Sequence, residues 1–358
     1  MKLRWWPHTC DARIASTRLR CLRIVDALRA QGLDACLYDP AETAPDVLVL
    51  SKRYDADSLT IASALQTRGT RVVLDLCDNH FYCEPPTPAW TRRATLLRDA
   101  VARVDAVIVA TPALAEIVRA ECPAAAPILY TIGDAVEPPW SPQPARRWRH
   151  QLDEWALCKL AEQVARQRAQ GGISLLWFGN QGSDNAEGGL LDLLRIAEPL
   201  HALAQQQPTN LTVISNHRGK FEAVARALPL PCRYLPWRAT TFSRATALHD
   251  IALLPVSLNP FTTCKTNNRV ATALMHGVAV VADPVPSYRE FDDCIVLGDW
   301  GAGLRMLAAC RARRAAGVER GRARIAAHWG LDTIAGHWRT ALEQVAPTPA
   351  TDGARNAP

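Results

Sequence analysis

The sequence predicts an α/β protein with two doubly wound, parallel sheets. Short apolar runs typical of buried strands alternate with amphipathic segments of about 10–14 residues, which is the pattern of parallel βα units. The chain has 358 residues, of which 48% are hydrophobic and 21% charged, so it is globular and too long for one ordinary core. Four prolines within residues 137–144 mark a linker. Together these observations predict two domains.

The first domain is expected over residues 1–137, and its elements follow from local signals. Apolar residues recur at helical spacing between Thr17 and Ala30, and Gly32 ends that helix. Pro112 suits the first turn of another helix. We expect strands at 3–6, 34–37, 46–50, 71–75, 106–110 and 128–132, and helices at 17–30, 57–67, 92–103 and 112–121.

A proline-rich linker and a connector helix, residues 138–170, lead to a second domain at 171–330. A final helix is expected at 331–346, and the tail 347–358 lacks the apolar content needed for order. In the second domain we expect strands at 174–178, 211–215, 232–235, 251–256, 278–282 and 294–297, and helices at 190–205, 241–248, 267–276 and 301–313, with further helix at 318–345.

Composition excludes several classes of protein. The net charge of +6 is mild and its arginines are dispersed, with no basic run interleaved with aromatics, so nucleic acid is not an expected partner. No apolar stretch reaches the roughly 20 residues of a membrane span, and the N-terminus does not resemble a signal peptide. The 11 cysteines form no Cys-x-x-Cys pair, which favours reduced cytosolic thiols over a zinc site. The first strand is not followed by Gly-x-Gly-x-x-Gly, so a dinucleotide cofactor is not predicted.

The stretch from Asp250 to Asp283 carries the strongest site signal. It predicts a strand, a polar loop, a helix that Thr266 caps, Gly277 at the position after the helix, and a second strand. Around the helix start lie Lys265, Asn267, Asn268 and Arg269. Free N–H groups and the helix dipole favour an anion there. The alternative is that the two cations are solvated and the asparagines only cap the helix.

This stretch resembles the donor-site segment of retaining glycosyltransferases with the two-domain B-type fold. The resemblance rests on the run Asn259 to Val270, on Ala273-Leu and on Gly277-Val-Ala-Val-Val-Ala. Thr272 stands where the family usually has its ribose-binding glutamate, and Cys264 stands where many relatives have another glutamate. Weaker similarities to bacterial members occur at 16–20, around 52, at 75–81 and at 109–115.

The resemblance implies two Rossmann-like domains facing across a cleft. It implies a bacterial enzyme of polysaccharide biosynthesis that moves a sugar from a nucleotide-diphosphate sugar to a glycan, a lipid-linked sugar or a protein. Retention of configuration, no metal and no cofactor are expected, because cations and helix N-termini replace a metal. The expected location is the cytoplasm or the inner face of the membrane, with peripheral membrane contact through basic residues.

The resemblance also implies site residues. For the donor, the glycine-rich loop 179–189 would let the backbone approach a diphosphate, Trp237 would stack on a base, and a plain surface loop or a packed tryptophan are the alternatives. The expected donor-binding residues are Gly179, Asn180, Asn216, Trp237, Lys265, Asn268, Arg269 and Thr272. The expected acceptor-binding residues are Asp11, Arg18, Lys52 and Asn79, and the expected catalytic residues are His80, Asp78 and Lys265.

Two residues on the first helix, Arg18 and Arg20, are ambiguous, and we expect one of them on a solvated face. Asp75 is expected only to end its strand. Two other functions stay open. The replacements at Thr272 and Cys264 suit a non-catalytic relative that binds a glycan or a partner enzyme, and the fold also suits a nucleotide-sugar epimerase.

Overall fold

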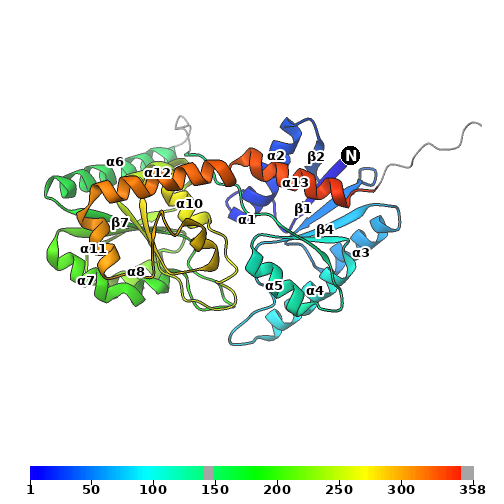
Figure 1. Ribbon diagram of the computed structural model, residues 1–358, viewed down its shortest axis with the longest axis horizontal. Coiled ribbons are helices and arrows are strands. Elements are labelled where there is room, and N and C mark those ends of the chain that lie inside the picture. The colour runs from blue at the N-terminus through cyan, green and yellow to red at the C-terminus, as the bar shows by residue number, and fades with distance from the viewer. Residues whose placement is uncertain (140–147, 348–358) are drawn as a thin grey trace, which may run out of the picture. The chain divides into compact units, whose positions relative to one another are not determined.

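The computed structural model describes residues 1–139 and 148–347, and the chain forms two compact units (Figure 1). The first unit holds Met1–Cys77, Arg92–Ile132 and the chain from Leu331 onward; the second holds Asp78–Thr91 and Gly133–Gly330. Residues 78–91, which we expected with the first domain, therefore pack in the second. The linker at 140–147 and the tail from 348 lie outside the described residues.

The first unit contains a six-stranded parallel sheet in the order β2-β1-β3-β4-β5-β6. All six predicted strands are present, with ends within two residues of the prediction. They are β1 (Lys2–Pro7), β2 (Asp34–Leu37), β3 (Val47–Ser51), β4 (Arg71–Leu76), β5 (Ala106–Val109) and β6 (Ile128–Thr131).

Helices cover this sheet, and their starts follow the local sequence. The Asp55 side chain accepts a hydrogen bond from the Ser58 N–H at 2.9 Å, and Thr111 caps the helix that Pro112 begins. The helices of the unit are α1 (Ala15–Thr17), α2 (Arg23–Ala30), α3 (Ala56–Gln66), α4 (Pro88–Arg103), α5 (Pro112–Glu121) and α13 (Leu331–Val345).

The first helical segment is not one regular helix, and this changes the position of Arg20. A π-helical stretch, Arg18–Leu22, joins α1 to α2. Arg20 is buried there, its guanidinium 2.7 Å from the Asp75 carboxylate and 5.5 Å from the Trp338 ring of α13. Of the two ambiguous arginines, Arg20 is therefore not the one on a solvated face, and Asp75, which was expected only to end its strand, pairs with it.

The second unit contains another six-stranded parallel sheet, in the order β12-β11-β10-β7-β8-β9. The predicted strands are again present. They are β7 (Ile173–Phe178), β8 (Thr209–Ser215), β9 (Cys232–Pro236), β10 (Ile251–Leu254), β11 (Ala279–Ala282) and β12 (Val296–Leu297).

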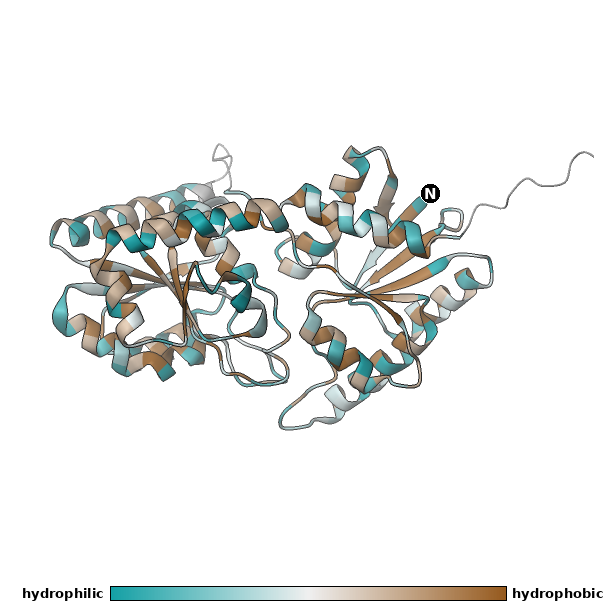
Figure 2. Ribbon diagram, in the orientation of Figure 1, coloured by the Kyte–Doolittle hydropathy of each residue, from teal (hydrophilic) through white to brown (hydrophobic). Residues whose placement is uncertain are grey.

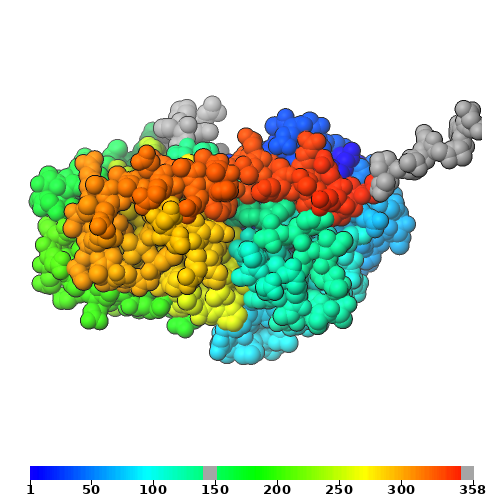
Figure 3. Space-filling model, viewed as in Figure 1, coloured from blue at the N-terminus to red at the C-terminus, as the bar shows by residue number. Residues whose placement is uncertain are grey.

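Both faces of this sheet are covered, which explains why β10 and β11 are apolar and buried throughout (Figure 2). Alternate residues of one strand enter two different cores: Leu176 and Phe178 lie on one face, Leu175 and Trp177 on the other. The first face is covered by α6 (Trp148–Ala169), α10 (Asn268–Met275) and α12 (Arg311–His328), the second by α7 (Ala197–Gln206), α8 (Arg218–Ala227) and α11 (Ala302–Ala309). Figure 3 shows α12 in orange beside α10.

Three helical predictions in this unit need correction. The helix expected at 190–205 begins as a 3₁₀ helix, Gly189–Ile196, before α7 starts. The helix expected at 301–313 ends at Ala309, and α12 begins two residues later. Helix α8 was not predicted; the His217 ring caps it by accepting from the Lys220 N–H at 3.0 Å. Helix α9 (Ala239–Ala247) lies near its predicted place.

Within the two described ranges, no helix combines the length and apolar content that crossing a lipid bilayer requires.

Candidate functional site

The strand order of the second sheet points to one edge of it as the candidate site. Strand β7 pairs with β8 on one side and with β10 on the other. The chain first adds strands to one side of β7 and later to the other side, so the topological switch point of the sheet lies between β7 and β10. In open parallel sheets a crevice for ligands forms at the carboxyl ends of the strands at such a reversal. Residues from Gly179 onward follow β7, and the segment from Pro255 to Asn267 follows β10.

Arg269, in the first turn of α10, reaches this reversal point. Its guanidinium carbon lies 5.1 Å from the Trp177 ring centroid and 5.9 Å from that of Phe178. The backbone of Gly179 lies beside the guanidinium, since a Cβ built there would be 3.5 Å from its Cζ and Nε atoms. The Nε and Nη2 atoms are inaccessible to solvent and have no hydrogen-bond partner among the described residues. Two donors of a buried cation are thus without a protein acceptor.

Burial affects the charge of Arg269 directly. Desolvation lowers its pKa, while the negative charge of Asp192 and a hydrogen bond with the Tyr288 hydroxyl act in the opposite direction. Burial also raises the pKa of Tyr288. A desolvated guanidinium without an adjacent carboxylate is costly, and an anion bound against it would lower that cost. Neither Tyr288 nor Asp192 had a signal in the sequence.

The glycine-rich loop after β7 is tightly folded. Gly179, Gly182, Gly188 and Gly189 all have positive φ, and at Gly189 a Cβ would lie 2.5 Å from the Gln181 carbonyl oxygen. The Gly189 N–H donates to the Asp192 carboxylate at 2.8 Å. The start of this helix is therefore occupied by its own carboxylate and is 3₁₀ rather than α.

Asp192 also ties the two loops of the edge together. Its other carboxylate oxygen accepts from the Ser257 N–H at 3.1 Å. Asn259 donates to the Glu187 carbonyl at 3.0 Å. Asn180, which was expected to bind the donor, is exposed, and its side chain accepts from the Gln181 N–H at 2.8 Å. The backbone of both loops is held in place without a ligand.

Lys265 is paired with an acid of the same unit. Its ammonium bonds the Asp78 carboxylate and lies 3.9 Å from the Phe261 ring centroid. The side chain remains about one-third exposed, at 36%. Two residues predicted to be catalytic, Asp78 and Lys265, are therefore brought together, as a half-exposed ion pair beside the donor segment.

The loop 78–91 is anchored to this unit by several bonds. The Asn79 amide donates to the Pro260 carbonyl at 2.9 Å and accepts from the Phe81 N–H at 3.1 Å. Asn185 donates to the Tyr82 carbonyl at 2.8 Å. Asn79 is buried and its bonds hold the loop, while its predicted contact with an acceptor stays a prediction.

His80 lies inside the same loop. It is buried, and its ring packs edge-on against Trp90 at 5.7 Å. Its Nε2 is 3.9 Å from the Asp78 carboxylate. The three residues predicted near the reacting groups, Asp78, Asn79 and His80, are thus brought together, with Asp78 the most exposed of the three side chains.

The polar side chains at the start of α10 are mostly hydrogen-bonded to acidic residues from other parts of the second unit. Thr266 and Asn268 both donate to the same Asp134 oxygen, at 3.0 and 2.6 Å. Asn267 donates to the Glu290 carboxylate, whose pKa burial raises. The residue before α10 is Asn267 and its side chain makes no capping bond, so the prediction that Thr266 caps the helix is wrong. Asp134 is a hydrogen-bond acceptor at the start of α10 that the sequence did not single out.

The two positions that replace family glutamates differ in environment. Cys264 is buried and its thiol donates weakly to the Pro260 carbonyl at 3.4 Å; burial raises its pKa to about 11. Thr272 is half-buried on α10, and its carbonyl accepts from His276 Nδ1 at 2.7 Å. Neither supplies an anionic group to the edge.

The ends of β8 and β9 hold the other predicted donor residues. Asn216 is exposed just beyond β8. Trp237 follows β9, and its backbone N–H donates to the Ser215 carbonyl at 2.9 Å. The centroid of its half-buried ring is 6.2 Å from the centroid of the Phe242 ring. Stacking of a base on this ring stays a prediction.

The acceptor-side residues predicted in the first unit come from three places: Asp11 from the loop after β1, Arg18 from the π-helical stretch, and Lys52 from the loop after β3. Arg13 pairs with Asp11 at 2.7 Å and lowers its pKa to about 2. Arg18 donates to the Ala12 carbonyl at 2.8 Å. Lys52 directly follows β3 with φ of 52°, an uncommon value for a residue with a side chain.

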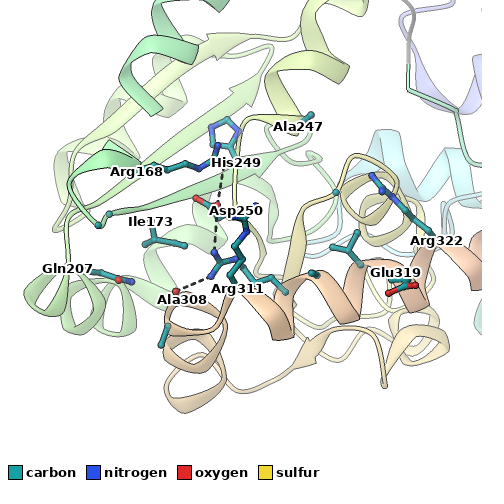
Figure 4. A pocket seen from close by; sticks show the side chains of 17 residues that line it. Arg168, Ile173, Gln207, Ala247, His249, Asp250, Ala308, Arg311, Glu319 and Arg322 are labelled. Atoms are coloured by element: carbon teal, nitrogen blue, oxygen red, sulfur yellow. Dashed lines mark hydrogen bonds and ion pairs between the residues drawn. The ribbon is translucent and has the colours of Figure 1, made fainter. Parts of the chain in front are cut away.

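A wide hollow of about 820 Å³ lies at the opposite edge of the second sheet, where the strands begin (Figure 4). Ile173, Asp250 and Gly277 line it. Three of its four arginines bond backbone carbonyls at helix ends, which helix C-termini favour. These bonds are Arg168 to Leu248, Arg314 to Leu307 and Arg322 to Leu274. These three cations have a structural explanation, and the sheet edge is the wrong one for a donor.

No protein-family model and no curated protein matches the chain. Among solved structures it is similar to one from E. coli, described as trehalose-6-phosphate bound with UDP-2-fluoro glucose. The TM-score is 0.62 with 16% identity, over 90% of this chain and 78% of that one. It is also similar to Anabaena HepE in complex with UDP, with TM-score 0.62 and 13% identity over 96% of this chain and 100% of that one. The trehalose-6-phosphate synthase OtsA matches with TM-score 0.58 and 14% identity, over 90% of this chain and 76% of that one.

The fold is that of the B-type glycosyltransferases. The two parallel, doubly wound sheets and these structural neighbours confirm the predicted fold class and the resemblance read from the donor segment. At such low identity the neighbours establish the fold, and the chemistry must come from this chain's own residues.

Proposed function

We propose that this chain is a glycosyltransferase that takes a sugar from a uridine-diphosphate sugar and gives it to a carbohydrate acceptor. Three structural neighbours are described in complexes with UDP or a UDP-sugar. The observation that carries the proposal is Arg269, a desolvated cation at the strand reversal with two buried donors lacking protein acceptors. A diphosphate supplies the oxygens that such a guanidinium binds.

The proposed reaction needs charge stabilisation on the leaving group. The bond between the anomeric carbon and the β-phosphate oxygen breaks, and negative charge develops on the diphosphate. Arg269 and Lys265 would share that charge, which is the role a divalent cation plays elsewhere. Lys265 would exchange its Asp78 partner for phosphate oxygens.

The finer assignments belong to the same proposal. The acceptor hydroxyl forms the new bond to the anomeric carbon, and in a retaining reaction its proton passes to the departing phosphate oxygen. No side-chain nucleophile is then required. We propose that the enzyme is retaining and needs neither metal nor cofactor, and that Trp237 stacks on the base.

Melting of the full chain with UDP, without metal, tests the donor site. A ligand at 100 times its dissociation constant should stabilise the protein by about 2.7 kcal/mol. Lys265→Ala should weaken UDP binding about tenfold, because it removes one charged hydrogen bond. It should also reduce release of UDP from a UDP-sugar in the presence of acceptor.

Two variants make this result specific. Lys159→Ala removes an exposed ammonium from α6 of the same unit and should leave UDP binding unchanged. Asp78→Asn breaks the same ion pair but leaves the ammonium in place, so UDP affinity should hold or rise. Equal UDP affinity in the wild type and in Lys265→Ala would contradict the proposal.

A further inference from the structure

The hollow at the opposite edge of the second sheet contains one arginine that the fold does not explain. Arg311 is the first residue of α12, lines the hollow and is exposed (Figure 4). Within residues 1–139 and 148–347 its side chain has no hydrogen bond and no ion pair. The other three arginines of the hollow bond carbonyls at helix ends, so Arg311 is the exception.

Arg311 belongs to a cluster with two of these arginines. Arg314 follows it by one turn of α12 and lies 3.9 Å from the Asp250 carboxylate. Arg168, at the end of α6, lies 3.1 Å from the same carboxylate. Arg322 is three turns further along α12, roughly 16 Å along the helix axis, and does not belong to the cluster. We call Arg168, Arg311 and Arg314 the arginine cluster.

The arginine cluster has an excess of positive charge. Its carboxylate, Asp250, accepts from the Ser174 N–H at 3.0 Å with one oxygen and pairs with Arg168 through the other. Three guanidinium groups around one carboxylate leave a formal charge of +2. The start of α12 adds partial positive charge, because its first turn has neither an acidic residue nor a side-chain cap.

The cluster keeps hydrogen-bond donors for a ligand. A guanidinium has five N–H donors. Arg168 uses Nη2 alone, for the Leu248 carbonyl at 2.7 Å and for Asp250. Arg314 uses Nη1 for the Leu307 carbonyl at 2.6 Å. These bonds hold the two side chains in place, and their other N–H groups have no hydrogen-bond acceptor in the described part of the chain.

The charges of the cluster act on one another. Burial lowers the pKa of Arg314, and the positive charges of Arg168 and Arg311 lower it further, while Asp250 acts in the opposite direction. A lowered pKa means that the charged form is held at a cost in free energy. An anion bound among the guanidinium groups would reduce that cost.

A divalent oxyanion suits this cluster better than a carboxylate does. The hollow has a volume of about 820 Å³, which lies within the roughly 300–1,000 Å³ of ligand pockets. A phosphate dianion matches the excess of two charges, and its oxygens accept several charge-assisted hydrogen bonds at once. A carboxylate carries one charge, and a single guanidinium binds both of its oxygens.

We propose that the arginine cluster binds a phosphate group, either inorganic phosphate or the phosphate of a small metabolite. The site is separate from the donor edge, because the hollow lies where the strands of the second sheet begin and the donor edge lies where they end. The inference depends on residues of the second unit alone and does not require glycosyl transfer.

The test follows melting of the full chain, without UDP, as inorganic phosphate is added at neutral pH. Sodium chloride of equal ionic strength is the reference, and we expect saturable stabilisation by phosphate beyond that of chloride. Glycerol 3-phosphate is the second arm. Tighter binding of glycerol 3-phosphate than of phosphate would assign the phosphate of a metabolite, and equal or weaker binding would assign inorganic phosphate.

Matched variants separate the cluster from general charge. Arg311→Gln should weaken phosphate binding about tenfold or more, because it removes a charged hydrogen bond. It should fold normally, since Arg311 has no partner among the described residues. Arg311→Lys keeps the charge and should lose less affinity. Arg313→Gln makes the same change two residues later, at an exposed position that does not line the hollow, and should behave as wild type.

Equal phosphate affinity in the wild type and in Arg311→Gln, or no response beyond chloride, would overturn the proposal. A response that is lost in Lys265→Ala and kept in Arg311→Gln would place the phosphate at the donor edge and would also overturn it. The donor proposal is read separately from the UDP titration. Phosphate binding through Arg311, in a chain that does not bind UDP, would keep this site and remove the glycosyl transfer.

Discussion

Two arginines that pack against aromatic rings, the buried Arg20 and the half-buried Arg269, have opposite surroundings. Arg20 lies beside Trp338 with the Asp75 carboxylate at 2.7 Å and the Ile132 carbonyl at 2.8 Å. Arg269 lies beside Trp177 and Phe178, with two of its nitrogen atoms lacking a protein acceptor among the described residues. Aromatic packing is common to both, so the carboxylate is the difference.

The difference separates a structural cation from one suited to bind a ligand. A guanidinium paired with a buried carboxylate satisfies its partner, and removing it leaves an isolated charge. A guanidinium that is desolvated without a carboxylate partner lowers the stability of the folded protein until an anion binds to it. Burial of an arginine therefore says little about function until its acceptors are identified.

The largest effect should come from breaking the Arg20 pair. Arg20→Met leaves Asp75 buried without its cation, and we expect a loss of about 3–5 kcal/mol in the free energy of unfolding. Urea unfolding measures this loss. UDP affinity of the folded fraction should not change, because Arg20 belongs to the first unit.

Two further variants check the cause. Adding Asp75→Asn to Arg20→Met should recover part of the stability, since the unpaired charge is gone. Arg119→Met removes an exposed arginine that pairs with Glu116, and it should cost less than about 1 kcal/mol. A small loss in Arg20→Met would mean that the pair is not structural.

Acid should weaken the second unit through His249. This ring is buried with Nδ1 bonded to the Ala245 carbonyl at 2.9 Å, and burial lowers its pKa to about 4 from 6.5. Between pH 6.5 and pH 4, His249 therefore binds a proton in the unfolded chain but not in the folded chain. Stability present above pH 6.5 should fall by about 3 kcal/mol as the pH drops through that window to 4.

Hydrogen exchange resolved by unit measures this acid effect in β10, the strand that follows His249. His249→Asn keeps a donor for the carbonyl and does not titrate, so the pH dependence of exchange in β10 should flatten. His201→Asn, at an exposed position of α7, should leave it as in the wild type. An unchanged slope in His249→Asn would assign the acid sensitivity to other groups.

The smallest effect on stability should come from Arg269. Arg269→Met replaces a desolvated cation by an apolar chain of similar length, so we expect a change of less than about 1 kcal/mol or a gain. UDP affinity should nevertheless fall tenfold or more. Urea unfolding and UDP titration of the same variant measure the two quantities.

Arg226→Met, which removes an exposed arginine from α8, is the matched control and should preserve both quantities. A large loss of stability in Arg269→Met would show that Arg269 and Arg20 have the same role, and the comparison between them would fail.

The fold could be predicted from the sequence because each strand is recognisable from its own residues. Val47–Ser51 and Ile251–Leu254 are wholly buried, and a parallel strand covered on both faces must be apolar throughout. The missed or divided helices have local causes. Helix α8 starts at a histidine cap, and the Asp192 bond turns the start of the 190 segment into a 3₁₀ helix.

The site was readable only in part. Gly277, with φ of 81°, and the strand-loop-helix order were confirmed, and they locate the polar loop. Which polar residue bonds which was not readable, because Asp134 and Glu290 approach from distant parts of the sequence. The donor and acceptor roles of individual residues stay predictions.

By itself the sequence determined the order of strands and helices, the division by a proline-rich linker and the place of the donor segment, because these depend on local periodicity and turn residues. Tertiary structure decided which charged side chains are paired and which are desolvated. Asp75 pairs with Arg20, Asp78 pairs with Lys265, and the Nε and Nη2 atoms of Arg269 have no acceptor within residues 1–139 and 148–347. Desolvation and pairing depend on which segments meet, and the sequence does not encode that meeting in any local pattern.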